Sequence, residues 1–494
     1  MKTPLIRRTR VARANRERGV TMVLVAVAMV AIIGMAALSI DVITLYLAKQ
    51  DVQRSADDAA LAAAKIISLS GITGDPANSR LRWGAICGGT GSLATRAAKA
   101  VADQNLLGGP VLTPTVTYSS GGTSNADCAA LSSTGFGVNP IVTVQLQRNN
   151  LPTFFSRIWG NTGNNISATA AAEVFNPSNS GNAGNVVTGN ITPVQPRCIK
   201  PLVVPNMEPL PLGTGGRYCT QGGGACQPII NLADGSIVNK GISLDGTGST
   251  GIIGETFWLT ADCDPSASSC RLVVANPKAN ITGAQVPPFP NLAYVPGQVT
   301  TPVTGVPSCS SGDEFEQAIE GCDAPTNYTC GLPPGSGGSN AADLSVNPSH
   351  STRDGVSCLI HEASGWDTTA PSGQDYLTST LGPPSSYPFQ IFAGSNSPAV
   401  SAGLTNGSPI SVSPSIVSLP IYDQTDASAA LSDGNKTNVT FVGFLQVFIN
   451  AVDQYGNVSV TVLNVSGCGN GSGTPVGTAV TANSPVPVRL ITPP

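Results

Sequence analysis

Charged residues are scarce in this chain of 494 residues, because Asp, Glu, Lys and Arg together make up only 11% of it. An average soluble domain carries roughly 25% charged residues, so the composition excludes a solvated coiled-coil rod. The net charge of −4 and the lack of a basic run beyond residue 19 argue against nucleic acid as the main partner. Hydrophobic residues still make up 41%, which is enough for a folded core.

Histidine is nearly absent, since the chain contains only His350 and His361. A Ser-His-Asp or Cys-His mechanism therefore has few possible bases, and no G-x-S-x-G motif occurs. Cys358 and His361 are spaced like metal ligands, but no second pair of ligands accompanies them. We therefore expect no enzymatic activity, no cofactor, no metal site and no small-molecule substrate.

Two short segments fit functional motifs that their surroundings do not support. Residues 246–251 fit G-x-G-x-x-G, but the following IIGETFWLT indicates a strand where a nucleotide site requires a helix. Residues 264–268 fit the D-x-S-x-S pattern of metal-dependent adhesion sites, yet they lie between Cys263 and Cys270 and lack a long apolar strand before them. A turn closed by a disulfide is the better interpretation of the second segment.

The chain has one long uncharged run, VTMVLVAVAMVAIIGMAALSI at positions 20–40. As a helix it spans roughly 30 Å, the thickness of a bilayer's hydrocarbon core. Residues 1–19 carry seven Lys or Arg and one Glu, and Asp41 follows the run. This asymmetry predicts a single-pass membrane helix, with a cytoplasmic N-terminus and the bulk of the chain outside. A cleaved secretory signal is the alternative, although the run is longer than a usual signal core.

The helical pattern continues beyond Asp41. Residues at alternating steps of three and four define one helix face: Val42, Leu45, Lys49, Val52, Ala56, Ala59, Ala63 and Ile66. A helix that continues unbroken to about residue 67 is on the order of 70 Å long. Its alanine-rich face contributes little hydrophobic energy, so we expect it to pack on a partner helix or sheet.

A small α+β module is predicted for residues 41–175. Val142, Val144 and Leu146 alternate with polar residues, as in a half-buried strand, and residues 93–107 predict a further helix. Pro152 can open a short helix between two strands. The apolar residues of that helix are Phe154, Phe155, Ile158 and Trp159. The outline is that of a pilin-like subunit on a long N-terminal helix.

Two of these segments resemble TadG-like proteins of bacterial Flp (Tad) pilus assembly. The first runs from Arg18 and Gly19 through the apolar helix into an Ala-Asp-rich helix, and the second covers residues 142–174. The matching positions of the first are Asp41, Tyr46, Gln53, Asp57, Ala59, Ala60 and Leu61. The resemblance covers little more than the first third of the chain. It implies a membrane-anchored component whose partners are other pilus-assembly proteins or pilins.

The apolar run contains no glutamate. Type IV prepilins are cut after a glycine and carry Glu as the fifth residue of the mature helix, whereas the fifth residue after Gly19 is Leu24. A carboxylate inside the membrane is costly and normally functional, so its absence argues against a processed pilin. We expect an uncleaved anchor that packs in the bilayer through the small residues Ala31, Gly34 and Ala37.

The remainder of the chain is expected to form a separate, mainly β domain at 193–494, outside the membrane. Residues 176–192 lack charge and have little to bury, which predicts a linker. The clearest regular structure beyond it is a hairpin at 439–465 around the turn at 455–457. The expected fold class is therefore α+β, with a single transmembrane helix, a pilin-like module and a β domain rich in disulfides.

All twelve cysteines follow the apolar run, on its predicted outer side. An even number in an oxidising compartment predicts disulfides. Cys219 with Cys226 and Cys263 with Cys270 each enclose six residues, and these are the expected local bridges. The other pairings stay open.

The sequence favours a non-enzymatic, membrane-anchored component of Flp/Tad pilus assembly. Such a protein would act through helix packing in the membrane and protein contacts outside it. The alternative is an anchored surface adhesion or ligand-binding protein, or a minor pilin incorporated in a fibre.

Overall fold

The computed structural model describes residues 17–74, 78–104, 114–151, 163–176, 194–209, 227–232, 252–273, 290–307, 312–322, 341–362, 373–379, 388–425, 431–468 and 480–493, apart from 121, 134 and 483. It also describes scattered residues between these ranges, among them 153, 155, 157, 160 and 309.

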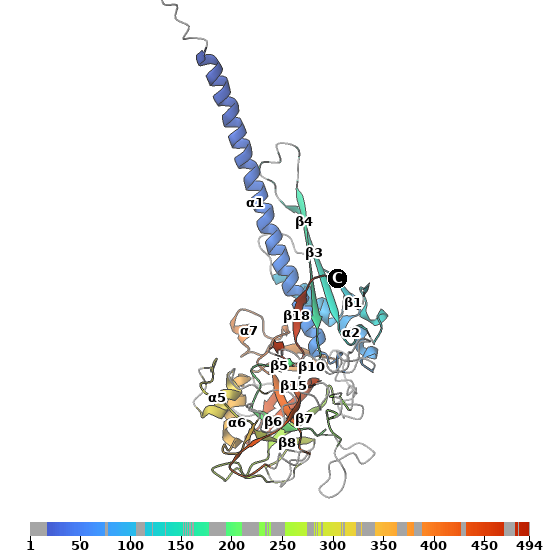
Figure 1. The fold of residues 1–494 in the computed structure, drawn as a ribbon, viewed down its shortest axis with the longest axis vertical. Helices are drawn as coiled ribbons and strands as arrows, with labels where there is room; N and C mark the ends of the chain where they lie inside the picture. The colour runs from blue at the N-terminus through green and yellow to red at the C-terminus, as the bar shows by residue number, and fades with distance from the viewer. Residues whose placement is uncertain are drawn as a thin grey trace, which may run out of the picture.

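The longest element is helix α1 (Glu17–Leu69), 53 residues without a break. Figure 1 shows it extending away from the rest of the molecule, with only its C-terminal half beside other elements. In that half, Val52, Ala56, Ala59 and Ala63 are buried, as their spacing predicts. Alanine lets neighbouring backbones approach closely, so this face fits against a sheet on one side and helix α3 (Leu93–Gln104) on the other.

The sheet beside α1 has five antiparallel strands in the order β18-β4-β3-β1-β2. Their bounds are β1 (Thr115–Ser120), β2 (Thr123–Asn125), β3 (Ile141–Leu151), β4 (Asn164–Val174) and β18 (Val488–Ile491). Strands β3 and β4 form a long hairpin in which Val142, Val144 and Leu146 face the core, as their alternation predicts. The edge strand β18 comes from the far end of the chain, so both ends of the sequence build this module.

Short helical segments close the module below the sheet. They are η1 (Asn78–Arg82), α2 (Trp83–Cys87) and η2 (Cys128–Ala130). A disulfide joins Cys87 to Cys128, and Trp83 packs edge-on against Phe136 with ring centroids 5.3 Å apart. The predicted helix at 93–107 is present as α3 up to Gln104, and its remaining positions lie outside the described residues.

The outer part of the molecule is built around a closed barrel of six strands in the order β13-β15-β16-β7-β8-β6. Their bounds are β6 (Leu202–Pro205), β7 (Thr256–Ala261), β8 (Asn291–Pro296), β13 (Ile416–Tyr422), β15 (Phe441–Val452) and β16 (Val458–Gly467). The predicted hairpin is the pair β15 and β16, in which Val452 lies opposite Val458. The two parallel pairs, β7 with β8 and β6 with β13, close the barrel.

Smaller elements surround the barrel. Helices α5 (Glu314–Glu320) and α6 (Ser349–Leu359) pack on each other, and α7 (Pro398–Ser401) lies beside a small sheet. That sheet contains β10 (Tyr376–Ser379), β11 (Phe389–Phe392) and β12 (Pro409–Ile410). Two further pairs join β9 (Ala341–Asp343) to β14 (Lys436–Asn438) and β5 (Val194–Pro196) to β17 (Val480–Ala482).

The buried apolar residues of α1, the five-stranded sheet and the barrel form one continuous cluster. The expected class is confirmed, with a long apolar N-terminal helix, a mixed α+β module and mostly β structure downstream. The division at a 176–192 linker stays a prediction, because positions 177–193 lie outside the described residues.

Candidate functional site

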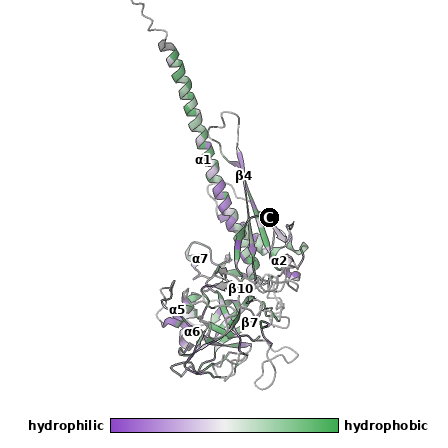
Figure 2. Ribbon diagram, in the orientation of Figure 1, coloured by the Kyte–Doolittle hydropathy of each residue, from purple (hydrophilic) through white to green (hydrophobic). Residues whose placement is uncertain are grey.

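The N-terminal half of α1 exposes nearly all of its large apolar side chains. Those from Val20 to Leu47 that remain exposed are Val20, Met22, Val23, Leu24, Val25, Val27, Met29, Val30, Ile32, Ile33, Met35, Leu38, Ile40, Val42, Ile43, Tyr46 and Leu47. Figure 2 shows this half as continuously hydrophobic and the half beside the strands as mixed. Within the part of the chain that the structure describes, α1 is the one helix long and apolar enough to cross a membrane.

The three small residues expected to pack in the bilayer do not share one environment. Ala31 is exposed, Gly34 is half-buried, and Ala37 is buried. No atom lies within 4 Å of the place that a Cβ at Gly34 would occupy, so this turn leaves room for a close neighbour. Ala37 faces the protein's own chain. Their role in helix packing stays a prediction.

Asp41 is the first acidic residue after the uncharged run, and it is only 5% exposed. Its carboxylate accepts hydrogen bonds from the backbone N–H of Phe155, at 3.1 Å to Oδ2 and 3.4 Å to Oδ1. Phe155 lies in the connection between β3 and β4. The helix expected there falls on Pro152, Phe154, Ile158 and Trp159, which lie outside the described residues. Phe155 is therefore held against α1 one residue beyond the predicted membrane segment.

Side chains of α1 also cover an open edge of the sheet. Strand β18 pairs with β4 only at 171–174, so the earlier part of β4 has no strand on that side among the described elements. Gln53 Nε2 donates to the carbonyl of Thr169 at 3.2 Å, and Lys49 Nζ donates to the carbonyl of Ser167. Unpaired edge carbonyls invite pairing with foreign strands, and these two side chains satisfy them. Two side chains of α1 thus take the place of a neighbouring strand as donors to this part of β4.

A buried polar network fixes the C-terminal end of α1 to the barrel. Asn464 of β16 donates from Nδ2 to the carbonyl of Ser68 at 2.9 Å and to Thr73 Oγ1 at 3.3 Å. Asn176 donates from Nδ2 to Thr73 Oγ1 and to the carbonyl of Val465, each at 3.2 Å. Buried amides are costly unless paired, so satisfied groups of this kind define one orientation. The long helix and the barrel are therefore joined rigidly.

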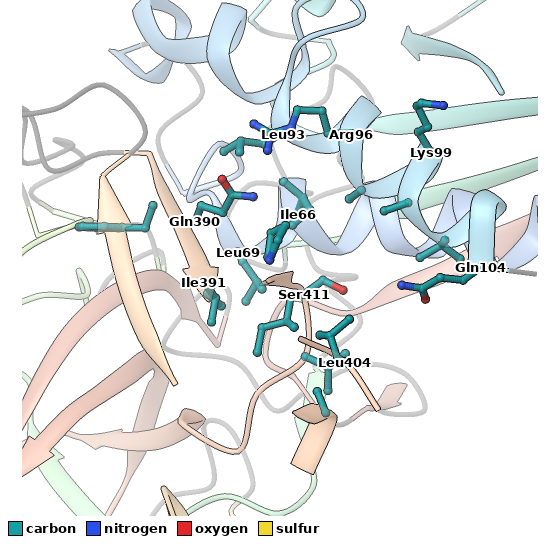
Figure 3. Close-up of a pocket in the computed structure, with 18 of the residues that line it drawn as sticks. Ile66, Leu69, Leu93, Arg96, Lys99, Gln104, Gln390, Ile391, Leu404 and Ser411 are labelled. Carbon is teal, nitrogen blue, oxygen red and sulfur yellow. The ribbon is translucent and has the colours of Figure 1, made fainter. Parts of the chain in front are cut away.

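A groove of about 910 Å³ lies beside this junction (Figure 3). Its walls come from the last turn of α1, one face of α3 and the small sheet of β10 to β12, with Leu69 and Ile391 at its centre. Arg96 and Lys99 lie on its α3 side, and Lys99 pairs with Asp103 at 3.3 Å. The walls are mainly apolar and include no histidine or cysteine, so among described residues the groove suits apolar contact rather than catalysis.

Neither histidine belongs to a cluster of metal-binding side chains in the described part of the chain. Cys358 forms a disulfide with Cys309, so its sulfur is not available to pair with His361 on a metal. Among the described residues no group of three or more His, Cys, Asp or Glu side chains is placed to hold a metal ion. The glycine motif at 246–251 lies outside the described residues.

Cys263 and Cys270, one of the two expected local pairs, form a disulfide with a Cα–Cα distance of 4.8 Å. Inside this loop Asp264 Oδ1 accepts from the backbone N–H and the hydroxyl of Ser266, at 2.9 and 2.7 Å. The D-x-S-x-S segment is thus a closed turn. Cys219 and Cys226 lie outside the described residues. A further bridge joins Cys198 to Cys322, a pairing that spacing alone did not indicate.

One buried acid beside the barrel, Glu255, has no hydrogen-bond partner for its side chain among the described residues. Glu255 is fully buried. Burial raises the pKa of Glu255 well above its ordinary 4.5, and the nearby charge of Glu208 raises it further. A folded-state pKa above the unfolded value means that this group supports folding at low pH and that the support is lost as pH rises through the folded pKa.

We expect Glu255→Gln to increase stability in a pH-dependent way. The amide cannot ionise, so the variant should match the wild type near pH 4 and exceed it increasingly as the pH is raised towards 8. Denaturant unfolding of the full chain in detergent at several pH values measures this difference. Glu314→Gln at an exposed glutamate is the control, and equal pH profiles for Glu255→Gln and the wild type would contradict the prediction.

Comparison with known proteins finds one family match, in the N-terminal segment. Residues 19–65 match the family described as putative Flp pilus-assembly TadE/G-like. No curated protein and no solved structure matches the chain. The matched residues lie entirely within α1 and include both its exposed apolar half and most of its buried half. Over residues 19–65 the chain is thus similar to the putative Flp pilus-assembly TadE/G-like family.

Proposed function

We propose that the protein is a non-enzymatic, membrane-anchored component of Flp/Tad pilus assembly. The exposed half of α1 crosses the bacterial inner membrane once, with the basic residues 1–19 in the cytoplasm and the module and barrel outside. The observation that supports this most directly is the position of the family match. It covers the part of α1 in which an exposed apolar surface changes into a buried, alanine-rich one.

In this proposal α1 performs two tasks. Its first half contacts lipid and other membrane helices, for which the open turn at Gly34 offers a close approach. Its second half is fixed to the sheet and, through Asn464 and Asn176, to the barrel. The helix therefore holds the outer surfaces, including the apolar groove beside α3, at a fixed orientation to the membrane, where pilins or other assembly proteins reach them.

A helix exchange tests whether the sequence of α1 matters beyond anchoring. Deleting the protein should abolish surface pili, and the full chain should restore them. A chimera in which residues 20–40 are replaced by an unrelated transmembrane helix of equal length should remain in the membrane but fail to restore pili. Pili are counted by electron microscopy and in sheared fractions, with membrane levels of each chain as the control.

The two alternatives, an anchored surface adhesion or ligand-binding protein and a minor pilin, give different results in the same strains. A chimera that restores pili would contradict specific helix packing, and normal pili in the deletion strain would contradict the whole proposal. N-terminal sequencing of the chain in fibres and in membranes separates an anchor from a minor pilin. A chain that begins at or after Val20 and is present in fibres identifies a minor pilin, whereas an intact chain found only in membranes agrees with an anchor.

A further inference from the structure

The exposed apolar surface of α1 does not stop at the end of the uncharged run. Ile40, Val42, Ile43, Tyr46 and Leu47 are all between 46% and 63% exposed. From Val20 to Leu47 the helix is about 42 Å long at 1.5 Å per residue. A hydrocarbon core is about 30 Å thick, and core plus headgroup layers about 40–45 Å. The exposed apolar surface is therefore about as long as the hydrocarbon core together with both headgroup layers.

Asp41 is the one charged residue within this stretch, and it does not face outward. It lies on the covered side of the helix, four residues after buried Ala37, and the N–H of Phe155 donates to both of its oxygens. Because the protein's own backbone donates hydrogen bonds to the Asp41 carboxylate, this charge does not mark the end of the lipid-facing surface. Phe155 of the β3–β4 connection supplies this bond, so this residue lies level with residue 41.

Two exposed basic residues lie near this level. Lys49 is the first charged residue of the helix after Asp41, and it is exposed, as is Arg157 in the β3–β4 connection. Both can meet phosphate groups, and exposed Tyr46 is of the type that gathers at membrane–water boundaries. At about 100° per residue, the exposed residues Ile40 to Leu47 span an arc of about 160°. That arc is wider than the narrow seam through which one helix packs on another, so it suits lipid.

We infer that the outer headgroup layer of the bilayer covers the exposed face of α1 as far as Leu47, and that the β3–β4 connection reaches the same layer at Phe155 and Arg157. The hairpin is then a second membrane contact, and Asp41 is the residue that holds it there. This inference rests on the proposed membrane anchoring and adds a boundary and a contact that anchoring does not require.

Depth measurements on the full chain in liposomes test the inference. Single cysteines that carry a fluorophore are placed at Val30, Ile43, Leu47, Arg54 and Arg157, since none of the described native cysteines is free. The liposomes contain phosphatidylethanolamine and phosphatidylglycerol, with nitroxide quenchers in the headgroup layer or deep in the acyl chains. We expect deep quenching at 30, shallow quenching at 43, 47 and 157, and none at 54.

Each departure from these expected quenching results has a distinct meaning. Labels at 43 and 47 that stay in water while 30 is quenched would overturn the inference and leave the anchor intact. Labels at 43 and 47 that are shielded from water but not quenched by lipid would overturn it in favour of a protein partner. A label at 30 that escapes quenching would overturn the anchor and the inference together.

Substitutions at Asp41 test the link between helix and hairpin. Losing a hydrogen bond to a carboxylate should lower the ratio of docked to undocked conformations of the segment at Phe155 by about tenfold or more. Asp41→Ala should therefore strongly reduce shallow quenching at 157 without changing it at 47. Asp41→Asn keeps an acceptor oxygen and should have a smaller effect. Asp51→Ala, which removes a carboxylate farther along α1, is the control, and equal quenching at 157 in all three variants would overturn the role of Asp41.

Discussion

Two lysines placed in the exposed apolar half of α1, Met29→Lys with Ile33→Lys, are expected to release the protein from the membrane. Both side chains are more than half exposed and lie on one face of the helix. Each lysine near the centre of a membrane helix costs about 2.5–3.5 kcal/mol on insertion scales, whereas the residues that it replaces favour insertion. Together they should remove most of the driving force for the single span.

Fractionation with alkaline extraction measures this release, and protease protection reports which side holds the barrel. The matched control places two lysines at exposed positions outside the apolar half, Gln50→Lys with Ser124→Lys. The control should remain in the membrane fraction with its barrel on the same side as in the wild type. Equal membrane retention of both double variants would show that residues 20–40 are not the anchor.

The second large effect is expected at Gly71, two residues after the end of α1. Its φ of +72° is strained for any residue with a side chain, and a Cβ there would lie 2.4 Å from Ile253 Cγ2 and 3.2 Å from the Leu463 carbonyl. Backbone strain costs about 1–2 kcal/mol and overpacking about 1–3 kcal/mol. Gly71→Ala should therefore lower the free energy of unfolding by about 2–5 kcal/mol.

Gly89 supplies a matched control for the backbone alone. Its φ is +70°, but no atom lies within 4 Å of a Cβ built there, so Gly89→Ala should cost only the strain. Denaturant unfolding of the full chain in detergent compares the two. Adding Ile253→Ala to Gly71→Ala should recover part of the packing cost. If the Gly71 and Gly89 variants lose the same free energy of unfolding, the close approach of Ile253 to Gly71 adds no packing cost, and the prediction is contradicted.

The features that sequence reasoning identified correctly depend on nearby residues. The uncharged run and the steps of three and four predicted one continuous helix, and the alternation from Val142 to Leu146 predicted β3. The hairpin of β15 and β16 followed from two β-rich runs around a short turn. In each case the pattern lies within about 50 consecutive residues, where periodicity and turn chemistry determine the structure.

Features that depend on distant residues were not predictable in this way. Nothing in the local sequence of Val488–Ile491 indicates that it pairs with β4, and the short strands of the barrel close through parallel pairs without a local turn. The bond from Phe155 to Asp41 joins positions 114 residues apart. The disulfide Cys87–Cys128 was missed for the same reason, because spacing favours only local bridges.

The pairing of β18 with β4 also has a consequence for biogenesis. Arg489 on β18 pairs with Glu173 on β4, 316 positions earlier, so the sheet beside α1 stays incomplete until residues 488–491 have been synthesised. During that time the open edge of β4 is exposed to other nascent chains, and contacts of such long range form slowly. The five-stranded sheet is thus completed only after the barrel strands have been synthesised, although helix α1 precedes all of those strands in the chain.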